Sequence, residues 1–208
     1  MRIRRRIARA LAAVGLATAG IAGSVVTASP ASAEPTIPID WNVDATAHIA
    51  SLGIDNTMTG GRFTGSVDLG DSTITGDLTL PASETTLEVL GVGLADVGIQ
   101  VAPTGPVTGS VDLSTLTVEL TSSFDIKITH LNPFGVDWIN LVGRKCQTRE
   151  PVTLTMSGPI DLVGGSTFSG EFTIPKFKDC GLLTLPLNLL LPGGGNTFTA
   201  TASPPPAA

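Results

Sequence analysis

The two cysteines of the chain, Cys146 and Cys180, are flanked by cationic side chains whose type and spacing favour anion binding. A bond between these cysteines would place their Cα atoms within about 7 Å and bring the flanking groups together. Guanidinium and ammonium groups gathered in this way attract phosphate or carboxylate groups. The alternative is that the nearby Glu150, Glu171 and Asp179 neutralise them. The candidate anion-binding residues, called the cationic cluster below, are Arg144, Lys145, Arg149, Lys176 and Lys178.

Two apolar segments, Leu131–Val142 and Leu182–Leu191, lie beside the same cysteines. The second segment contains Pro186, which argues against a helix interior or a central strand. Either the two segments plug one end of the fold, or they line a pocket for an acyl chain or another apolar ligand. The candidate pocket residues are Phe134, Trp138, Leu141, Leu183, Leu185 and Leu187.

The remaining pattern predicts no catalytic residue, metal site or cofactor. The chain has no Gly-x-Ser-x-Gly motif, and we interpret its two histidines, His48 and His130, as surface or strand-end residues. Asp68, Asp112 and Asp161 come just before turns, and we interpret them as turn caps, although paired acids can also hydrolyse glycosidic bonds. Zinc-type and calcium-loop spacings are missing, and the lack of tyrosine disfavours an aromatic carbohydrate platform.

Most of the sequence between Trp41 and Ile174 alternates between apolar and polar residues, which is typical of half-buried β-strands. Thr, Ser and Asp dominate the polar positions, and Thr suits an exposed pleated surface. Breaks in the alternation fall at Gly- and Pro-rich turn sequences, and no convincing amphipathic helix is present. We therefore expect an all-β fold, either an antiparallel β-sandwich or a flattened β-barrel.

Individual strands can be assigned within this pattern. We expect strands over Val107–Leu120 and Phe124–His130, joined by a hairpin at Thr121-Ser122-Ser123. In the second of these strands, Phe124, Ile126 and Ile128 should face inward. A last strand is expected over Asn196–Thr201.

A short internal repeat points to two weakly duplicated halves. The sequence Gly65–Leu69 recurs as Gly109–Leu113 and, with changes, as Gly158–Leu162. The segment Ser72–Pro81 also parallels Ser166–Pro175 at an offset of about half the chain that remains after export. Chance reuse of turn residues in hairpins is the alternative explanation.

Residues 1–33 have the features of a signal peptide. Met1–Arg9 carries five arginines, Ala10–Thr27 is apolar, and Ala31-Ser32-Ala33 fits a signal peptidase site. We favour general export over the twin-arginine route. The expected organisation is a signal peptide over residues 1–33, one all-β domain over residues 34–202 and a disordered tail over residues 203–208. No transmembrane segment is expected after cleavage.

Export changes the interpretation of both charge and cysteines. Five of the twelve cations lie in residues 1–33 and all eighteen acids follow, so the exported chain has a net charge of 7 − 18 = −11. Such an acidic chain is not expected to bind nucleic acid. In an oxidising compartment, Cys146 and Cys180 most simply form one disulfide, which would close a loop of about 35 residues.

Several segments of the chain resemble a group of uncharacterised, secreted, β-rich actinobacterial proteins. The resemblance covers most of the exported chain and implies an extracellular domain with a disulfide, but it supplies no catalytic residue. The segments that carry it are Pro106-Val107-Thr108-Gly109 through Cys146, Phe168–Pro175, Asp179–Leu183 and Gly195–Thr199.

The sequence thus favours a secreted, non-enzymatic binding or envelope-associated module that takes an apolar or anionic envelope ligand. Envelope lipid and anionic polymer are the expected partners. One alternative is a structural or surface-interaction protein without a small-molecule ligand. The other is a hydrolase whose carboxylates the pattern does not identify.

Overall fold

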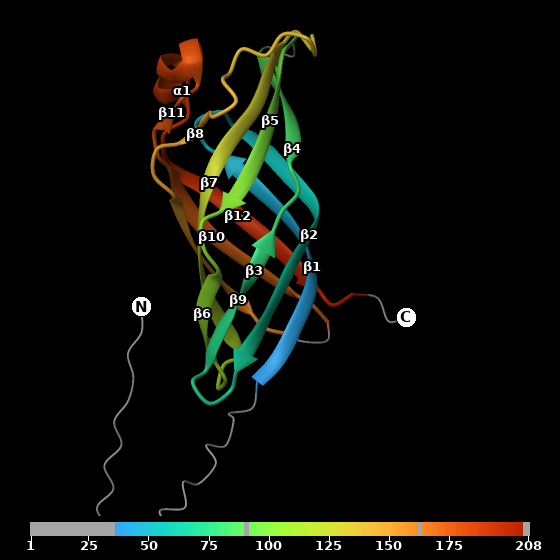
Figure 1. Cartoon of the computed structure of the whole chain (residues 1–208). Coiled ribbons are helices and arrows are strands. Elements are labelled where there is room, and N and C mark those ends of the chain that lie inside the picture. Colours follow the sequence, from blue (N-terminus) through green and yellow to red (C-terminus); the bar gives the residue numbers. More distant parts are fainter. Residues whose placement is uncertain (1–35, 90–91, 162–163, 206–208) are drawn as a thin grey trace, which may run out of the picture. The chain divides into compact units, whose positions relative to one another are not determined.

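The structure, a computed structural model, describes residues 36–89, 92–161 and 164–205 (Figure 1). The predicted signal peptide and residues 206–208 of the predicted tail lie outside these residues. The elements are β1 (Thr36–Ile49), β2 (Ile54–Asp68), β3 (Thr73–Thr79), β4 (Ser83–Val89), β5 (Val92–Pro103), β6 (Val107–Asp112), β7 (Thr117–Pro133), β8 (Gln147–Thr148), β9 (Val152–Pro159), β10 (Ser166–Ile174), β11 (Phe177–Lys178), the 3-10 helix η1 (Gly181–Leu183), α1 (Thr184–Leu190) and β12 (Gly193–Ser203).

Eight of the strands form a closed antiparallel barrel. Around the barrel the order is β7-β6-β3-β2-β1-β12-β10-β9, and β9 pairs with β7 to complete the ring. Closure satisfies the backbone hydrogen-bonding groups that an open sheet would leave at its edges. The predicted all-β class is confirmed, and of the two forms that the sequence left open, the barrel is the one observed.

The core lies inside the barrel because each strand alternates as predicted. In β1, Trp41, Val43 and Ala45 are buried, whereas the intervening Asn42 and Asp44 are exposed. Apolar side chains of the other barrel strands meet them in one continuous cluster. Among the described residues, all strands that contribute to this core belong to one compact unit, Glu34–Ala208.

Strand β7 changes partners on both sides near Phe124. Before this point it pairs with β6, up to the Thr108–Thr121 pair, and with β9, up to the Val152–Phe124 pair. Beyond it, β7 pairs with β5 along its length and with β8 at Lys127. The β4–β5 hairpin and the short strand β8 therefore extend one end of the barrel (Figure 1).

The predicted hairpin at Thr121-Ser122-Ser123 is wrong, because β7 runs through these residues without a break. The turn lies earlier, between Asp112 and Thr117, so the strand expected over Val107–Leu120 is two strands. The Asp112 carboxylate caps this turn. The Thr121-Ser122-Ser123 run stays within the strand because Thr and Ser side chains can occupy positions on either face of a sheet. The inward direction of Phe124 and Ile128 is confirmed by their burial.

The repeated sequence corresponds to three hairpin turns with the same local contacts. In each turn an aspartate accepts a backbone N–H two or three residues later, and the residue four positions on has a left-handed backbone. The interpretation of these aspartates as turn caps is confirmed. The repeated glycine lies where strands approach closely, because a Cβ there would come within 2.2–2.3 Å of a facing carbonyl oxygen. The pairs of aspartate and left-handed residue are Asp68 and Ser72, Asp112 and Leu116, and Asp161 and Gly165.

A short helical segment, residues 181–191, lies at the extended end of the barrel next to β8 and β11 and is called the lid below (Figure 1). Strands β8 and β11 pair with each other through Thr148 and Phe177. Cys146 and Cys180 form the predicted disulfide, with their sulfur atoms 1.99 Å apart. The bond joins the residue before β8 to the residue before the lid.

Pro186 lies in the first turn of α1, which is compatible with the expectation that it argues against a helix interior or a central strand. Pro186 is the third residue of α1, whose N-cap is Leu183. In the first turn a backbone N–H has no intrahelical acceptor, so proline removes no hydrogen bond there. A proline would break a hydrogen bond in a helix interior, but the seven-residue α1 has almost no interior beyond its first turn.

The disulfide should contribute substantially to stability because it closes a loop with a sequence separation of 34. Replacing both cysteines by serine should lower the free energy of unfolding by about 4 kcal/mol, or the melting temperature by roughly 10 °C. Thermal melts with and without reductant measure this effect. Reductant should lower the melting temperature of the wild type and leave that of the double variant unchanged. Equal melting temperatures for both proteins would contradict the prediction.

Candidate functional site

An apolar cavity of about 110 Å³ lies inside the barrel at the lid end. Its wall comes from several strands and includes Ile128 of β7, Phe172 of β10 and Phe198 of β12. The lid contributes Leu187 and Leu191. None of the lining side chains is ionisable. The cavity can therefore hold an apolar group but carries no acid, base or charged nucleophile.

Part of the cavity wall remains accessible to solvent. Ile49, Leu87, Ile99 and Ile126 line the cavity and pack against the core, yet each is only half-buried. Apolar surface that stays in contact with water gains free energy when another apolar group covers it, at about 25 cal/mol per Å². The wall thus provides a driving force for binding.

Asn56 is a buried polar residue within this wall. It lies on β2 between the exposed Asp55 and Thr57, so its side chain faces the barrel interior. Its Nδ2 donates to the hydroxyl of Ser83 at 2.9 Å, but its Oδ1 has no hydrogen-bond partner among the described residues. A buried acceptor without a partner costs about 1–3 kcal/mol. This oxygen is consequently a candidate contact for a ligand that carries a donor.

The lid presents apolar side chains on two faces. Leu187 is buried and lines the cavity together with Leu191, one turn further along. Leu182, Leu185 and Leu189 follow one another at spacings of three and four residues, and they are 95%, 80% and 85% exposed. Side chains at these spacings share one side of a helical segment. One face of the lid therefore closes the cavity while the other is open to solvent.

Asn188 fixes the lid to β11. Its Oδ1 accepts the backbone N–H of Phe177 at 2.5 Å, and its Nδ2 donates to the carbonyl oxygen of the same residue at 2.9 Å. At the start of the lid, the hydroxyl of Thr184 accepts the N–H of Cys180 and donates to the carbonyl of Gly181. The disulfide and these side chains hold the lid in place on the barrel.

The cationic cluster lies around β8, β11 and the disulfide. Arg149 donates its backbone N–H to the carbonyl of Lys176 at 2.7 Å, and Lys178 Nζ donates to the carbonyl of Arg149 at 3.3 Å. Arg144 and Lys145 are exposed in the turn that precedes Cys146. Among the described residues, no carboxylate forms an ion pair with any of the five cations. Within the described part of the chain, the nearby Glu150, Glu171 and Asp179 thus form no direct ion pair with the cationic cluster.

Two members of the cationic cluster lie directly beside the exposed leucines. A shallow groove is lined by Arg149 and Lys176 together with Leu185, Asn188 and Leu189 of α1. Positive charge and exposed apolar surface therefore form one continuous face on the outside of the lid.

The candidate pocket predicted from the sequence is largely wrong, because among its six residues Leu187 alone lines the cavity. Phe134, Trp138, Leu141 and Leu185 are exposed, and Leu183 is partly buried against the core without reaching the cavity. The physical reason is that the cavity wall comes mainly from the apolar faces of the barrel strands. Phe134, Trp138 and Leu141 consequently stay outside the cavity, whereas the lid reaches it through Leu187, Leu190 and Leu191.

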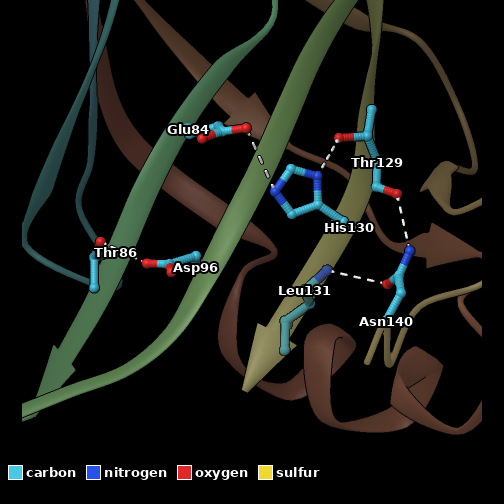
Figure 2. Close-up of polar contacts among 7 residues, drawn as sticks. All are labelled: Glu84, Thr86, Asp96, Thr129, His130, Leu131 and Asn140. Atoms are coloured by element: carbon cyan, nitrogen blue, oxygen red, sulfur yellow. Dashed lines mark hydrogen bonds and ion pairs between the residues drawn. The ribbon is translucent and has the colours of Figure 1, made fainter. Parts of the chain in front are cut away.

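Asn140 holds the segment after β7 against the end of that strand (Figure 2). Its Oδ1 accepts the backbone N–H of Leu131 at 3.1 Å and that of Val142 at 3.0 Å, and its Nδ2 donates to the carbonyl of Thr129 at 3.2 Å. Between these anchors, Trp138 is 85% exposed. The polar contacts of Asn140 therefore help to hold the segment at the end of β7, while Val142 is buried in the core.

The histidines make pairs outside the cavity. His130 Nε2 lies 3.7 Å from Glu84 Oε1, and its Nδ1 lies 3.2 Å from the hydroxyl of Thr129 (Figure 2). His48 Nδ1 lies 2.7 Å from Asp55 Oδ1. None of these side chains lines the cavity, which agrees with their interpretation as surface or strand-end residues.

The predicted carboxylates are occupied by turn contacts. The hydroxyl of Ser114 donates to Asp112 at 2.6 Å, and together with the Ser114 backbone N–H and contacts from Thr115 it lowers the pKa of Asp112 to about 2. A carboxylate held ionised in this way suits a turn cap and does not suit a general acid. Within the described part of the chain, no group of His, Cys, Asp and Glu side chains could hold a metal ion.

The helices in the described ranges are all too short, or too polar, to cross a membrane.

Apart from Leu187, the residues predicted for a pocket do not include those that line the cavity. The signal for Asn56 was present, because it falls on the apolar phase of β2 between Ile54 and Met58. A polar residue at an inward position is the kind of local inconsistency that often marks a site. The contribution of β5 and β7 to the wall could not be found, because the predicted hairpin separated the two halves of β7.

The attachment of the lid can be tested at Asn188. Asn188→Ala should lower the free energy of unfolding by about 1–3 kcal/mol, because it leaves the N–H and the carbonyl of Phe177 without partners. Faster hydrogen exchange at the Phe177 amide is the specific readout. Asn42→Ala, at an exposed position of β1, is the matched control and should change neither quantity. Unchanged exchange at Phe177 would show that the lid is held by other contacts.

The site combines an apolar cavity, one unpaired buried amide oxygen, a two-faced lid and a cationic cluster. Neither a family model, nor a curated protein, nor a solved structure matches the chain.

Proposed function

We propose that the protein is a secreted, non-enzymatic binding protein that holds an apolar ligand in the barrel cavity. The cavity carries this proposal, because its lining lacks ionisable side chains and includes half-buried aliphatic residues. Such a wall favours apolar groups and provides nothing for acid–base or nucleophilic chemistry. The signal-like residues 1–33 and the resemblance to secreted actinobacterial proteins support a location outside the cell, in association with the envelope.

The size of the cavity limits what it holds. At about 110 Å³ it is somewhat smaller than the apolar cavity of ~150 Å³ that can take up benzene. An alkyl segment of a few carbons fits this volume, and the remainder of a longer chain would lie along the half-buried wall residues. A linear acyl or alkyl chain therefore matches the site better than a bulky polycyclic ligand.

Asn56 adds a polar requirement to this ligand. The unpaired Oδ1 accepts a hydrogen bond, so the matching ligand group is a donor such as a hydroxyl. A ligand that carries this donor on an apolar chain would satisfy the buried oxygen and cover the wall together. We therefore propose an alkyl or acyl chain with a hydroxyl group as the ligand class.

The two alternatives receive less support from the geometry. A hydrolase would need carboxylates that meet in a cleft, whereas Asp68, Asp112 and Asp161 each cap a different turn. A purely structural role would need no apolar wall that remains half-exposed to water. The cavity favours ligand binding over both.

Filling the cavity should abolish binding. With 1-octanol as the probe, methyl NMR signals of Ile99 and Ile126 should shift in a saturable way in the wild type. Ala47→Leu places extra carbons into the cavity from β1 and should weaken the Kd at least tenfold, since the probe and the new side chain compete for the same volume.

Ala200→Leu is the matched control, because Ala200 faces a separate small cavity next to Trp41. This variant should bind octanol like the wild type, and melting curves establish that both variants are folded. Equal weakening by the two substitutions, or no saturable shift in the wild type, would contradict a binding role for the lid-end cavity.

The role of Asn56 can be tested with a pair of ligands. The wild type should bind 1-octanol about twofold to tenfold more tightly than methyl octyl ether, which lacks the donor. Replacing both partners, as Asn56→Leu with Ser83→Ala, leaves no buried group unpaired and should preserve the melting temperature while removing the preference. A preference that survives in this double variant would show that the hydroxyl is bound elsewhere.

A further inference from the structure

The outer face of the lid carries three leucines that are largely exposed to solvent. Leu185 and Leu189 are 80% and 85% exposed, and Leu182 extends the same side. Three neighbouring leucines on one side of so short a segment form a contiguous apolar patch. Such patches in soluble proteins commonly mark interaction sites.

The charged residues that line the groove beside this patch are both cations. Arg149 and Lys176 line the groove beside Leu185 and Leu189, and neither forms an ion pair with a described carboxylate. This local positive charge stands out in an exported chain whose net charge is −11. A partner that matches both properties is apolar inside and negatively charged at its surface.

We infer that the lid is a membrane-docking face, which inserts Leu182, Leu185 and Leu189 into an anionic lipid surface while Arg149 and Lys176 contact lipid phosphates. Apolar side chains of interfacial helices enter the boundary between headgroups and acyl chains, and flanking cations bind anionic headgroups. Asn188 holds α1 against β11 through both of its amide atoms, so the leucines face outward without any rearrangement.

A lipid surface fits this face better than a second copy of the chain. Two lids packed through their leucines would bring Arg149 and Lys176 of each copy close to those of the other, and like charges repel at such an interface. An anionic membrane instead supplies the opposite charge to every cation at once. The acidic remainder of the chain would keep the rest of the barrel away from the same surface.

Vesicle flotation tests this inference. The chain from Glu34 onward should float with phosphatidylcholine vesicles that contain about 30 mol% of the anionic lipid phosphatidylglycerol. Binding to pure phosphatidylcholine should be at least tenfold weaker, and high salt should weaken binding to the anionic vesicles. No binding to the anionic vesicles would overturn the docking role.

Two sets of variants separate the apolar and ionic contributions. Leu185→Gln with Leu189→Gln should reduce vesicle binding at least tenfold, whereas Leu113→Gln, in the β6–β7 turn, should not. Arg149→Gln and Lys176→Gln should each reduce binding to anionic vesicles about fivefold, whereas Arg62→Gln, which removes the same charge from β2, should not. Equal losses for lid variants and controls would show non-specific adsorption.

The proposed membrane docking and the proposed ligand binding can be tested independently of each other. Leu185→Gln with Leu189→Gln leaves the cavity wall intact, so octanol binding in solution should be unchanged. Conversely, Ala47→Leu should float with anionic vesicles like the wild type. Sedimentation of the vesicle-free protein checks the competing occupant: a dimer that Leu185→Gln with Leu189→Gln dissociates would assign the face to a second copy and overturn lipid docking.

Discussion

The exchange of partners along β7 is the constraint on which the rest of the structure depends. Its first part closes the barrel between β6 and β9, and from Phe124 onward it pairs with β5 and β8 instead. A strand that kept β9 beside it to the end would leave no place for β8, and hence none for β11 and the disulfide. The extended end of the barrel, with its apolar wall and its lid, is a consequence of this single exchange.

The alternation of apolar and polar residues in the sequence predicted the fold well and the site poorly, for one physical reason. Alternation reports which side of a strand is buried, so the all-β class, the inward face of β1 and the turn-capping aspartates were accessible. It does not report which strands are neighbours, and β7 was divided at a run of Thr and Ser that in fact continues the strand. The candidate pocket residues were taken from the apolar segments because hydrophobicity alone does not distinguish an exposed residue such as Trp138 from a buried wall residue such as Ile128.

The lid shows how one short segment can serve two surfaces. Leu187 and Leu191 close the cavity from above, while Leu185 and Leu189 face away from it. A helix that is apolar on both sides needs fixed attachment, because it would otherwise turn its outer leucines inward. The disulfide at Cys180 and the paired amide of Asn188 supply that attachment. Cavity and docking face are thus linked through the same residues, although each rests on its own observations.

The lid is tied at both ends, by the disulfide at Cys180 and by the start of β12 at Gly193. If α1 lifts from the barrel, it cannot diffuse away, so its effective concentration over the cavity stays high. Reclosing is then an intramolecular step, and short loops close within about 10–100 ns. The dwell time of a bound chain would accordingly depend on the rate at which the chain leaves the open cavity relative to the rate at which the tethered helix closes over it.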